Sequence, residues 1–243
     1  MIIAGVDDAG RGSVLGPLVI AGISVDESRI PELEEIGVKD SKLLTPQKRQ
    51  QLFRKIKKIA SGVCYEKIEP SEIDKVVFNG QKLFRLNYLE ARMMSSVLHR
   101  LKFDIAYVDC CDTNQTRFGQ LISDLISERD GKSFTVGEKN PLCERIKSEH
   151  HADRNYPVVS AASIVAKVTR DSFVRRLHKK HGMFGSGYPS DPNTISYLRG
   201  FYETSTPFPT ITRLSWLTIR RMQDPSLGTE EIVQNLIPEL SQD

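Results

Sequence analysis

The order of the expected elements predicts an α/β protein, in which a mixed sheet is flanked by helices and followed by a small helical C-terminal part. Three observations support this class. Two apolar, β-prone stretches at the N-terminus are joined by a glycine-rich turn, so they should pair antiparallel. A later β-prone stretch lies between long helical patterns, as in a strand with crossover connections. After residue 204 the chain holds only short helical patterns.

The first strand is predicted from the apolar, β-prone residues 1–5 and runs out at Asp7-Asp8, and the second strand is predicted at residues 14–25. The second is interrupted by Gly16-Pro17 and then becomes strongly apolar. A tight turn between these strands would place them side by side in the sheet.

The later strands are shorter. Residues 62–69 read as a third strand, and residues 104–109 read as a buried strand that ends in a carboxylate. Between residues 128 and 149 the sequence is polar and weakly patterned, with Asp130-Gly131 typical of a hairpin turn.

Two segments have the strongest helical periodicity, residues 82–101 and 156–180. The second has Pro157 near its start and Gly182 just past its end. Its first half is rich in small residues, so we expect a neighbouring element to pack closely against it. Shorter helices are expected at residues 46–60, 116–127, 191–204, 213–222 and 229–236.

The chain has 243 residues, of which 39% are hydrophobic and 27% charged, as in an ordinary globular protein. This length suits one core with an appendage, and we divide the chain into a main domain, 1–204, and a helical appendage, 205–243. No apolar run approaches the ~20 residues of a membrane span, and the N-terminus has no leader pattern, so a cytoplasmic protein is expected. We also expect a monomer. The four cysteines form no C-x-x-C pair and should serve packing.

The net charge of +3 is unevenly distributed. Residues 167–223 contain ten Lys and Arg but three Asp and Glu, whereas residues 224–243 contain five acidic residues and no basic one. The basic segment is consistent with a polyanionic partner. A set of solvated helix faces explains the same charges equally well.

The pair Asp7-Asp8 ends the first strand and is followed by the turn Gly10-Arg11-Gly12. Successive side chains in a strand point to opposite faces, so both carboxylates can meet at one cation only if the strand ends or twists between them. The two glycines permit such a break and let the backbone approach a ligand. The turn therefore favours a divalent metal beside an anion or a hydroxyl, although a polar turn without a ligand is the simpler alternative.

Two further carboxylates could join this site. Asp109 closes the strand at 104–109, and Asp153 lies just before the helix at 156–180. We expect the ends of these segments to meet Asp7 and Asp8 at one rim of the sheet.

Four blocks of sequence resemble the ribonuclease HII family, in particular its archaeal and eukaryotic-like branch. They occur in the family's order and span most of residues 2–222. The blocks are GVDDAGRGSVLGPLV at 5–19, DSKLL at 40–44, ADRNYPVVSAASIVAKVTRD at 152–171 and GSGYPSDP at 185–192.

The resemblance implies a ribonuclease H-like fold and an endonuclease. Such an enzyme cuts the RNA strand of RNA–DNA hybrids and incises 5′ of a single ribonucleotide in duplex DNA, a reaction of replication and repair that leaves 3′-hydroxyl and 5′-phosphate ends. By resemblance, Asp7, Asp8, Asp109 and Asp153 hold two Mg²⁺ or Mn²⁺ ions. Two such metal ions, roughly 3.5–4 Å apart, catalyse an in-line displacement.

The resemblance also assigns substrate contacts. Gly10, Arg11 and Gly12 match the loop that reads the 2′-hydroxyl, and Tyr188 matches a tyrosine that stacks on the adjoining sugar. Lys42 and Lys167 are candidate phosphate contacts.

Two features depart from the family pattern. Asp8 stands where the family normally has Glu, for which we expect retained activity with an altered metal preference or a weaker response to a lone ribonucleotide. The interval between the third and fourth acid is longer than usual, through extra residues around 133–147. The alternative function is a catalytically weakened module that binds RNA–DNA hybrids.

Overall fold

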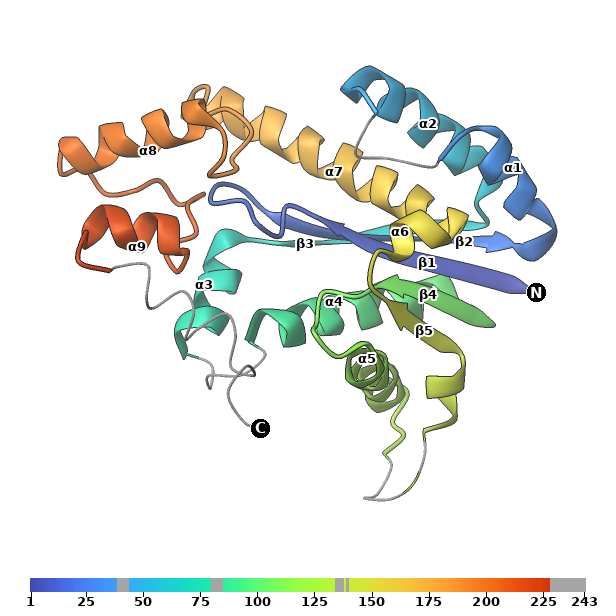
Figure 1. Ribbon diagram of the computed structural model, residues 1–243. Coiled ribbons are helices and arrows are strands. Elements are labelled where there is room, and N and C mark those ends of the chain that lie inside the picture. Colours follow the sequence, from blue (N-terminus) through green and yellow to red (C-terminus); the bar gives the residue numbers. More distant parts are fainter. Residues whose placement is uncertain (39–43, 80–84, 134–137, 139, 228–243) are drawn as a thin grey trace, which may run out of the picture.

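The computed structural model describes residues 1–38, 44–79, 85–133, 138 and 140–227. Its centre is a five-stranded sheet in the order β3-β2-β1-β4-β5 (Figure 1). The first three strands in chain order pair antiparallel, whereas β4 pairs parallel with β1 and with β5. The predicted mixed sheet is therefore confirmed. The strands are β1 Ile2–Ala9, β2 Leu18–Asp26, β3 Gly62–Ile68, β4 Ile105–Asp109 and β5 Ile146–Glu149.

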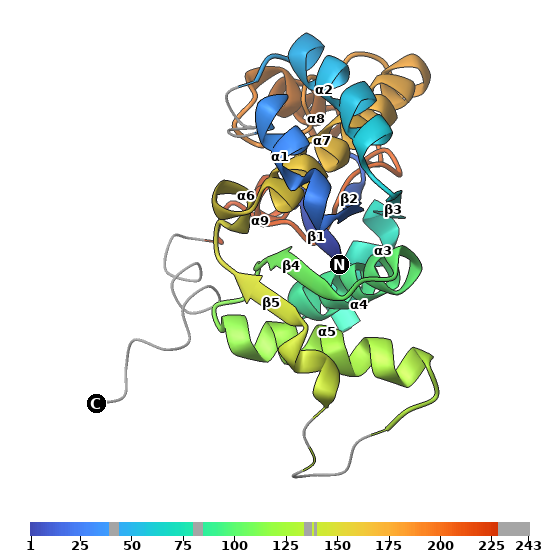
Figure 2. The same ribbon diagram turned by 90° about the vertical axis from the view of Figure 1, so that its right-hand side faces the viewer.

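Helices cover both faces of this sheet (Figures 1 and 2). One face carries α1 Ile30–Glu35, α2 Pro46–Ile59, α6 Ala152–Asn155 and α7 Pro157–His181. The other carries α3 Pro70–Asn79, α4 Arg85–Leu101 and α5 Gln115–Arg129. Beyond one end of the sheet lie α8 Pro192–Glu203 and α9 Leu217–Gln223. Two short 3₁₀ helices complete the described elements, η1 Glu27–Arg29 and η2 Pro141–Glu144.

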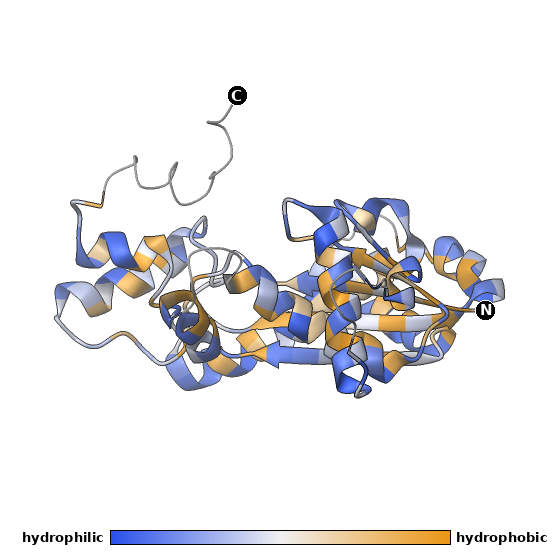
Figure 3. Ribbon diagram, turned by 90° about the horizontal axis from the view of Figure 1, so that it is seen from below, coloured by the Kyte–Doolittle hydropathy of each residue, from blue (hydrophilic) through white to orange (hydrophobic). Residues whose placement is uncertain are grey.

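The alternation of side chains along β1 creates two separate cores. Ala4 and Val6 point into the layer of α4 and α5, whereas Ile3 and Ala9 point into the layer of α2 and α7. In Figure 3 the hydrophobic parts of the ribbon lie on the strands and on the helix surfaces that face them. Burial on both faces fixes the register of β1.

The close contact predicted for the small-residue half of α7 is present. Gly5 of β1 lies against the start of this helix, where an added Cβ would come within 2.4 Å of the Val158 carbonyl. A residue with a side chain at position 5 would push the helix away from the sheet. The contact matters for function because α7 carries residues of the candidate site.

A third core joins the C-terminal part to the main domain. Its members include Val14 and Leu15, which precede β2, together with Phe184, Leu198 and Ile219. Residues on both sides of position 204 thus share one hydrophobic cluster, and the boundary at that position stays a prediction.

Two details of the predicted elements are wrong. Asp130-Gly131 follows α5 and caps its C-terminus, so it is not a hairpin turn. The helix expected at 213–222 begins only at Leu217, because residues 209–216 form turns that pack around the buried Arg213. The helix expected at 229–236 lies outside the described residues. Within the described residues, no helix has the length and apolarity needed to cross a membrane.

Candidate active site

A pocket of about 240 Å³ at the end of β1 contains most of the predicted site residues. The carboxylates of Asp7, Asp8 and Asp109 line it. Because β1 and β4 are parallel neighbours, with Val6 opposite Val108, their C-terminal ends meet at the same edge of the sheet. Other lining residues are Gly10, Arg11, Gly12, Ser163, Lys167 and Tyr188.

The strand does not break between the two adjacent aspartates, contrary to the expectation from sequence. The pairing of β1 with β2 continues through Asp7, Asp8 and Ala9. The two carboxylates therefore leave opposite faces of the sheet. Asp7 accepts a hydrogen bond from Ser163 of α7, and Asp8 lies near Glu90 of α4.

Crowding of acidic groups perturbs both carboxylates. Burial raises the pKa of Asp7 well above its usual value, and the charges of Asp8 and Asp109 raise it further. Burial followed by the charge of Glu90 raises the pKa of Asp8 to about 7, against a smaller lowering by Arg11. A cation placed among these groups would offset the repulsion.

A hydrogen bond connects Asp109 to the backbone of the segment that carries Asp153. The Oδ1 atom of Asp109 accepts a hydrogen bond of 2.8 Å from the N–H of Ala152, the residue before Asp153. Asp153 is buried at the start of α6, and its carbonyl accepts a hydrogen bond from the Ser160 hydroxyl. Its side chain does not line the pocket, so the structure brings together three of the four predicted carboxylates.

Arg11 is held by residues that sequence reasoning missed. Its Nε lies 3.0 and 3.1 Å from the two carboxylate oxygens of Glu90, and its Nη2 donates to Asn87 Oδ1 at 2.7 Å. Glu90 is fully buried. A sequence signal existed, because Glu90 interrupts the apolar stripe of α4 between Leu86 and Met93.

Arg213 anchors the same turn from the C-terminal part of the chain. Its guanidinium donates to the carbonyl of Arg11 at 2.8 Å and to that of Gly16 at 3.1 and 3.2 Å. The side chain is fully buried and packs 4.9 Å from the Trp216 ring centroid. Burial and the nearby charge of Arg170 lower the pKa of Arg213. Neither its burial nor these partners could be read from the sequence.

Arg170 connects the turn at residues 10–12 to the loop that carries Tyr188. Its guanidinium lies 4.6 Å from the Tyr188 ring centroid, and its Nη2 donates to the Ser186 carbonyl at 3.1 Å. Gly10 has a φ of +94°, and a Cβ there would come within 2.4 Å of Arg170 Nε. The missing side chain of Gly10 is what admits Arg170 beneath the turn.

The chain from residue 4 to residue 219 matches the family model described as ribonuclease HII. The chain belongs to the ribonuclease HII family. It is similar to the ribonuclease HII of Thermococcus sibiricus, with 40% identity over 239 residues that cover 98% of this chain and 97% of that protein. The family is enzymatic, so the pocket is a candidate nuclease site.

Solved structures of relatives share the fold. The crystal structure of ribonuclease H2 from Pyrococcus horikoshii superposes with a TM-score of 0.78 at 40% identity, covering 93% of this chain and 98% of that one. The ribonuclease HII of Archaeoglobus fulgidus, solved in a complex with PCNA, gives 0.75 at 34% identity and covers 89% and 95%. The ribonuclease H-like fold expected from sequence is confirmed.

In this chain the acidic residues do not form a ready metal cage. Among the described residues, no three His, Cys, Asp or Glu side chains are arranged to hold an ion as they stand. The opposed directions of Asp7 and Asp8 explain this arrangement. The donor set nevertheless fits a hard divalent cation, since carboxylate oxygens are its preferred ligands. Lys42 lies outside the described residues.

Proposed function

We propose that this chain is a metal-dependent endonuclease that hydrolyses the RNA strand of RNA–DNA hybrids. It also incises 5′ of single ribonucleotides embedded in duplex DNA and leaves 3′-hydroxyl and 5′-phosphate ends. The observation that carries the proposal is one pocket that combines the carboxylates of two parallel strands with the glycine turn and Tyr188. Acidic groups suited to cations thus lie beside groups suited to a sugar.

Asp7, Asp8 and Asp109 would hold the ions, and Asp153 would join them after a change of its side-chain conformation. When bound, two Mg²⁺ or Mn²⁺ ions supply an activated water and stabilise the leaving 3′-oxygen. The raised pKa values of Asp7 and Asp8 agree with this role, because they reflect a concentration of negative charge in a buried place. Phosphodiester hydrolysis by such a site needs no nucleophilic side chain.

The turn at residues 10–12 would distinguish RNA from DNA. A 2′-hydroxyl is the group that separates the two sugars, and backbone atoms held in place can hydrogen-bond it. A deoxyribose would leave those atoms unpaired. Leaving polar groups unpaired discriminates between two ligands more strongly than a small difference in apolar packing does. The side chain of Arg11 contacts Glu90 and Asn87, and Arg213 holds the Arg11 carbonyl, so the turn is fixed before substrate arrives.

Tyr188 and Lys167 would position the strand around the scissile bond. Arg170 packs against the Tyr188 ring and restricts its orientation. Lys167 lines the pocket from α7, where an ammonium group can contact a phosphate. The remaining basic residues of this helix would hold the duplex.

The proposal is tested by mapping cleavage of a DNA duplex that contains one ribonucleotide, with Mg²⁺ or Mn²⁺ added. We expect one incision 5′ of the ribonucleotide and none in an all-DNA duplex. The variant Asp7→Asn should lose cleavage and keep duplex binding in a gel-shift measurement, because the charge lost is one that would hold the ions. Cleavage that persists with EDTA, or cuts that ignore the ribonucleotide, would refute the proposal.

The second candidate function, a hybrid-binding module, is favoured by one observation. Asp8 is shorter than the Glu of the family pattern and leaves the sheet on the face opposite to Asp7. A module without activity would bind the ribonucleotide duplex and leave it intact with either metal. The same cleavage experiment therefore separates the two functions.

A further inference from the structure

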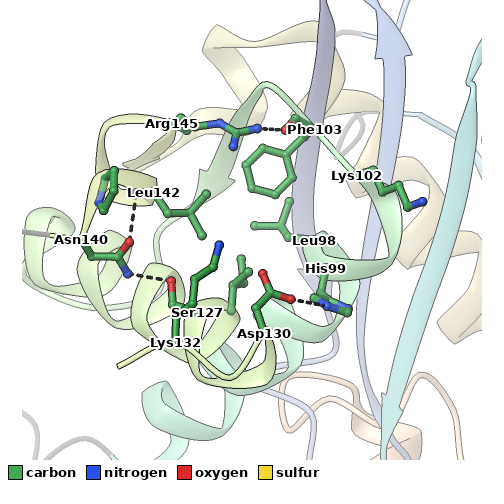
Figure 4. A pocket seen from close by; sticks show the side chains of 12 residues that line it. Leu98, His99, Lys102, Phe103, Ser127, Asp130, Lys132, Asn140, Leu142 and Arg145 are labelled. Atoms are coloured by element: carbon green, nitrogen blue, oxygen red, sulfur yellow. Dashed lines mark hydrogen bonds and ion pairs between the residues drawn. The ribbon is translucent and has the colours of Figure 1, made fainter. Parts of the chain in front are cut away.

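A larger cavity lies away from the candidate active site, between the C-terminal ends of α4 and α5 and the 3₁₀ helix η2 (Figure 4). Its volume is about 460 Å³. Lys102 and Phe103 border it just before β4 begins, whereas Asp109 closes the same strand at the other end. This α4–α5 cavity is therefore a separate place in the fold, and its lining includes residues of the stretch that sequence analysis singled out as extra, such as Asn140 and Leu142.

The inner surface of the cavity is apolar. Leu98 and Ile126 come from the buried sides of α4 and α5, and Leu142 and Phe103 complete the surface. The Phe103 ring is held by Arg145, whose guanidinium carbon lies 5.3 Å from the ring centroid. A cavity of this size and lining is in the range that encloses small organic molecules.

The polar groups around this surface are mainly cationic. In Figure 4 the Lys132 side chain extends into the cavity over the apolar residues. Arg145 lies at the rim, with its Nε donating to the Asp104 carbonyl at 2.7 Å and its Nη2 donating to the Phe103 carbonyl. Among the described lining residues Asp130 is the one carboxylate, and it is paired with His99 Nε2 at 3.0 Å.

The Asn140 side chain shapes the wall. It is almost fully buried, and its Nδ2 donates to Ser127 Oγ and to Asp124 Oδ1, both at 3.0 Å. Its Oδ1 accepts from the Leu142 N–H at 3.0 Å. These bonds fix the first turn of η2, so the cavity is built by a satisfied polar network.

One structural role of Lys132 needs to be weighed. A cation near the C-terminus of a helix is favoured by the helix dipole. Here the last carbonyls of α5 already accept hydrogen bonds from the N–H groups of Asp130, Gly131 and Lys132, at 3.2, 3.0 and 2.9 Å. The ammonium points into the cavity and not along the helix axis (Figure 4), so capping does not account for its direction.

We propose that the α4–α5 cavity is a binding site for a small amphipathic anion, an aromatic or branched aliphatic molecule with one acidic group. The apolar body would lie against Leu98, Phe103 and Leu142. The acidic group would lie at the Lys132 ammonium, where it gains charge-assisted hydrogen bonds, and the charge of Arg145 at the rim would add to the attraction. This site does not depend on the proposed nuclease function.

The test is calorimetric titration of the full chain with 2-naphthoate, compared with the neutral 2-naphthamide of the same shape. We expect one saturable site for 2-naphthoate with a dissociation constant below about 1 mM, as ligand size allows, and at least fivefold weaker binding of the amide. Lys132→Ala should weaken 2-naphthoate at least fivefold and leave the amide unchanged. Leu142→Trp, which fills the cavity, should abolish binding of both.

Lys55→Ala removes an exposed lysine of α2 and serves as the matched control, for which unchanged binding is expected. The thermal unfolding midpoint of each variant shows whether it remains folded. Equal affinity for the acid and the amide would overturn the proposal, as would binding that survives Leu142→Trp in a folded variant. A titration without saturable heat would also overturn it.

Discussion

The buried pair formed by Arg11 and Glu90 gives the sharpest prediction, which concerns the substitution Glu90→Gln. Glu90 has no exposed surface, whereas 40% of the Arg11 side chain is exposed. Burial raises the pKa of Glu90 despite the opposing effect of Arg11. Relative to the unfolded chain, the fold therefore disfavours the ionised form of Glu90, because burying the carboxylate costs more free energy than its contacts with Arg11 return.

The expected change in stability and its dependence on pH follow from the upward shift of the Glu90 pKa. Glutamine removes the charge whose burial raises the pKa, and water can solvate Arg11 because 40% of its side chain is exposed. We therefore expect between no change and about 2 kcal/mol of added stability at pH 7. For a chain of this size that is a rise of up to about 4–8 °C in Tm. Because the folded pKa is raised, Glu90 is protonated in both states below 4.5, and the advantage of the variant disappears there.

The same substitution should impair catalysis. Arg11 would lose two charge-assisted contacts that hold the turn at residues 10–12, and a loss of about 1.4 kcal/mol in positioning is a tenfold loss of rate. We expect kcat/KM on a duplex with one ribonucleotide to fall about tenfold or more. The assay combines thermal unfolding with cleavage kinetics.

Glu66→Gln is the matched control. Glu66 pairs with Arg100 at 3.1 Å on the surface, so its replacement should change stability by less than about 1 kcal/mol and leave cleavage unchanged. The reasoning is refuted if Glu90→Gln destabilises the fold by about 2 kcal/mol or more, because the pair would then be a structural contact. Unchanged cleavage by a folded Glu90→Gln variant would refute the positioning role.

Four further substitutions test the site and its surroundings. Gly10→Ala should cost about 1–3 kcal/mol of stability through its positive φ and its contact with Arg170, whereas Gly12→Ala, with nothing within 4 Å of its added Cβ, should be close to neutral in chemical denaturation. Burial raises the pKa of Asp112, but hydrogen bonds from Asn114, Asn87 and Arg117 lower it by more. Its stabilising charge is therefore complete above pH 3.8 and is lost as the pH falls through the lowered pKa of the folded state. Asp112→Asn should lose about 1–3 kcal/mol at pH 7 and progressively less as the pH falls below 3.8, measured by urea unfolding; a loss that does not change with pH contradicts this. Asp8→Glu lengthens the side chain by ~1.5 Å and should raise the Mg²⁺-supported cleavage rate relative to the Mn²⁺-supported rate, and an identical ratio in both proteins would contradict the expectation.

Much of the fold follows from local sequence patterns. The apolar, β-prone start of the chain, the caps at Thr45 and Asp191, and the helical periodicity before residue 101 each depend on neighbours in the chain. Elements with such local causes are recovered close to their bounds. The candidate pocket was also foreseen in part, because the sequence pattern places Asp7, Asp8 and Asp109 near strand ends. The parallel pairing of β1 with β4 then brings these ends together.

The contacts that position the site depend on residues far apart in the chain. Glu90 meets Arg11 across 79 positions, and Arg213 reaches the Arg11 carbonyl across 202. No local pattern encodes such pairs, since they arise only when α4 and the C-terminal turns pack against the end of β1. The extent of β1 also depends on another segment, because its pairing with β2 continues the strand through Asp7 and Asp8.

The sequence by itself therefore determined which side chains carry the chemistry and on which elements they lie. The tertiary structure decided how those side chains are directed: Asp7 toward α7, Asp8 toward α4, Asp153 outside the pocket, and the glycine turn held between two buried arginines and one buried glutamate. The physical reason is that residue type is set locally, whereas direction and burial are set by the packing of distant segments.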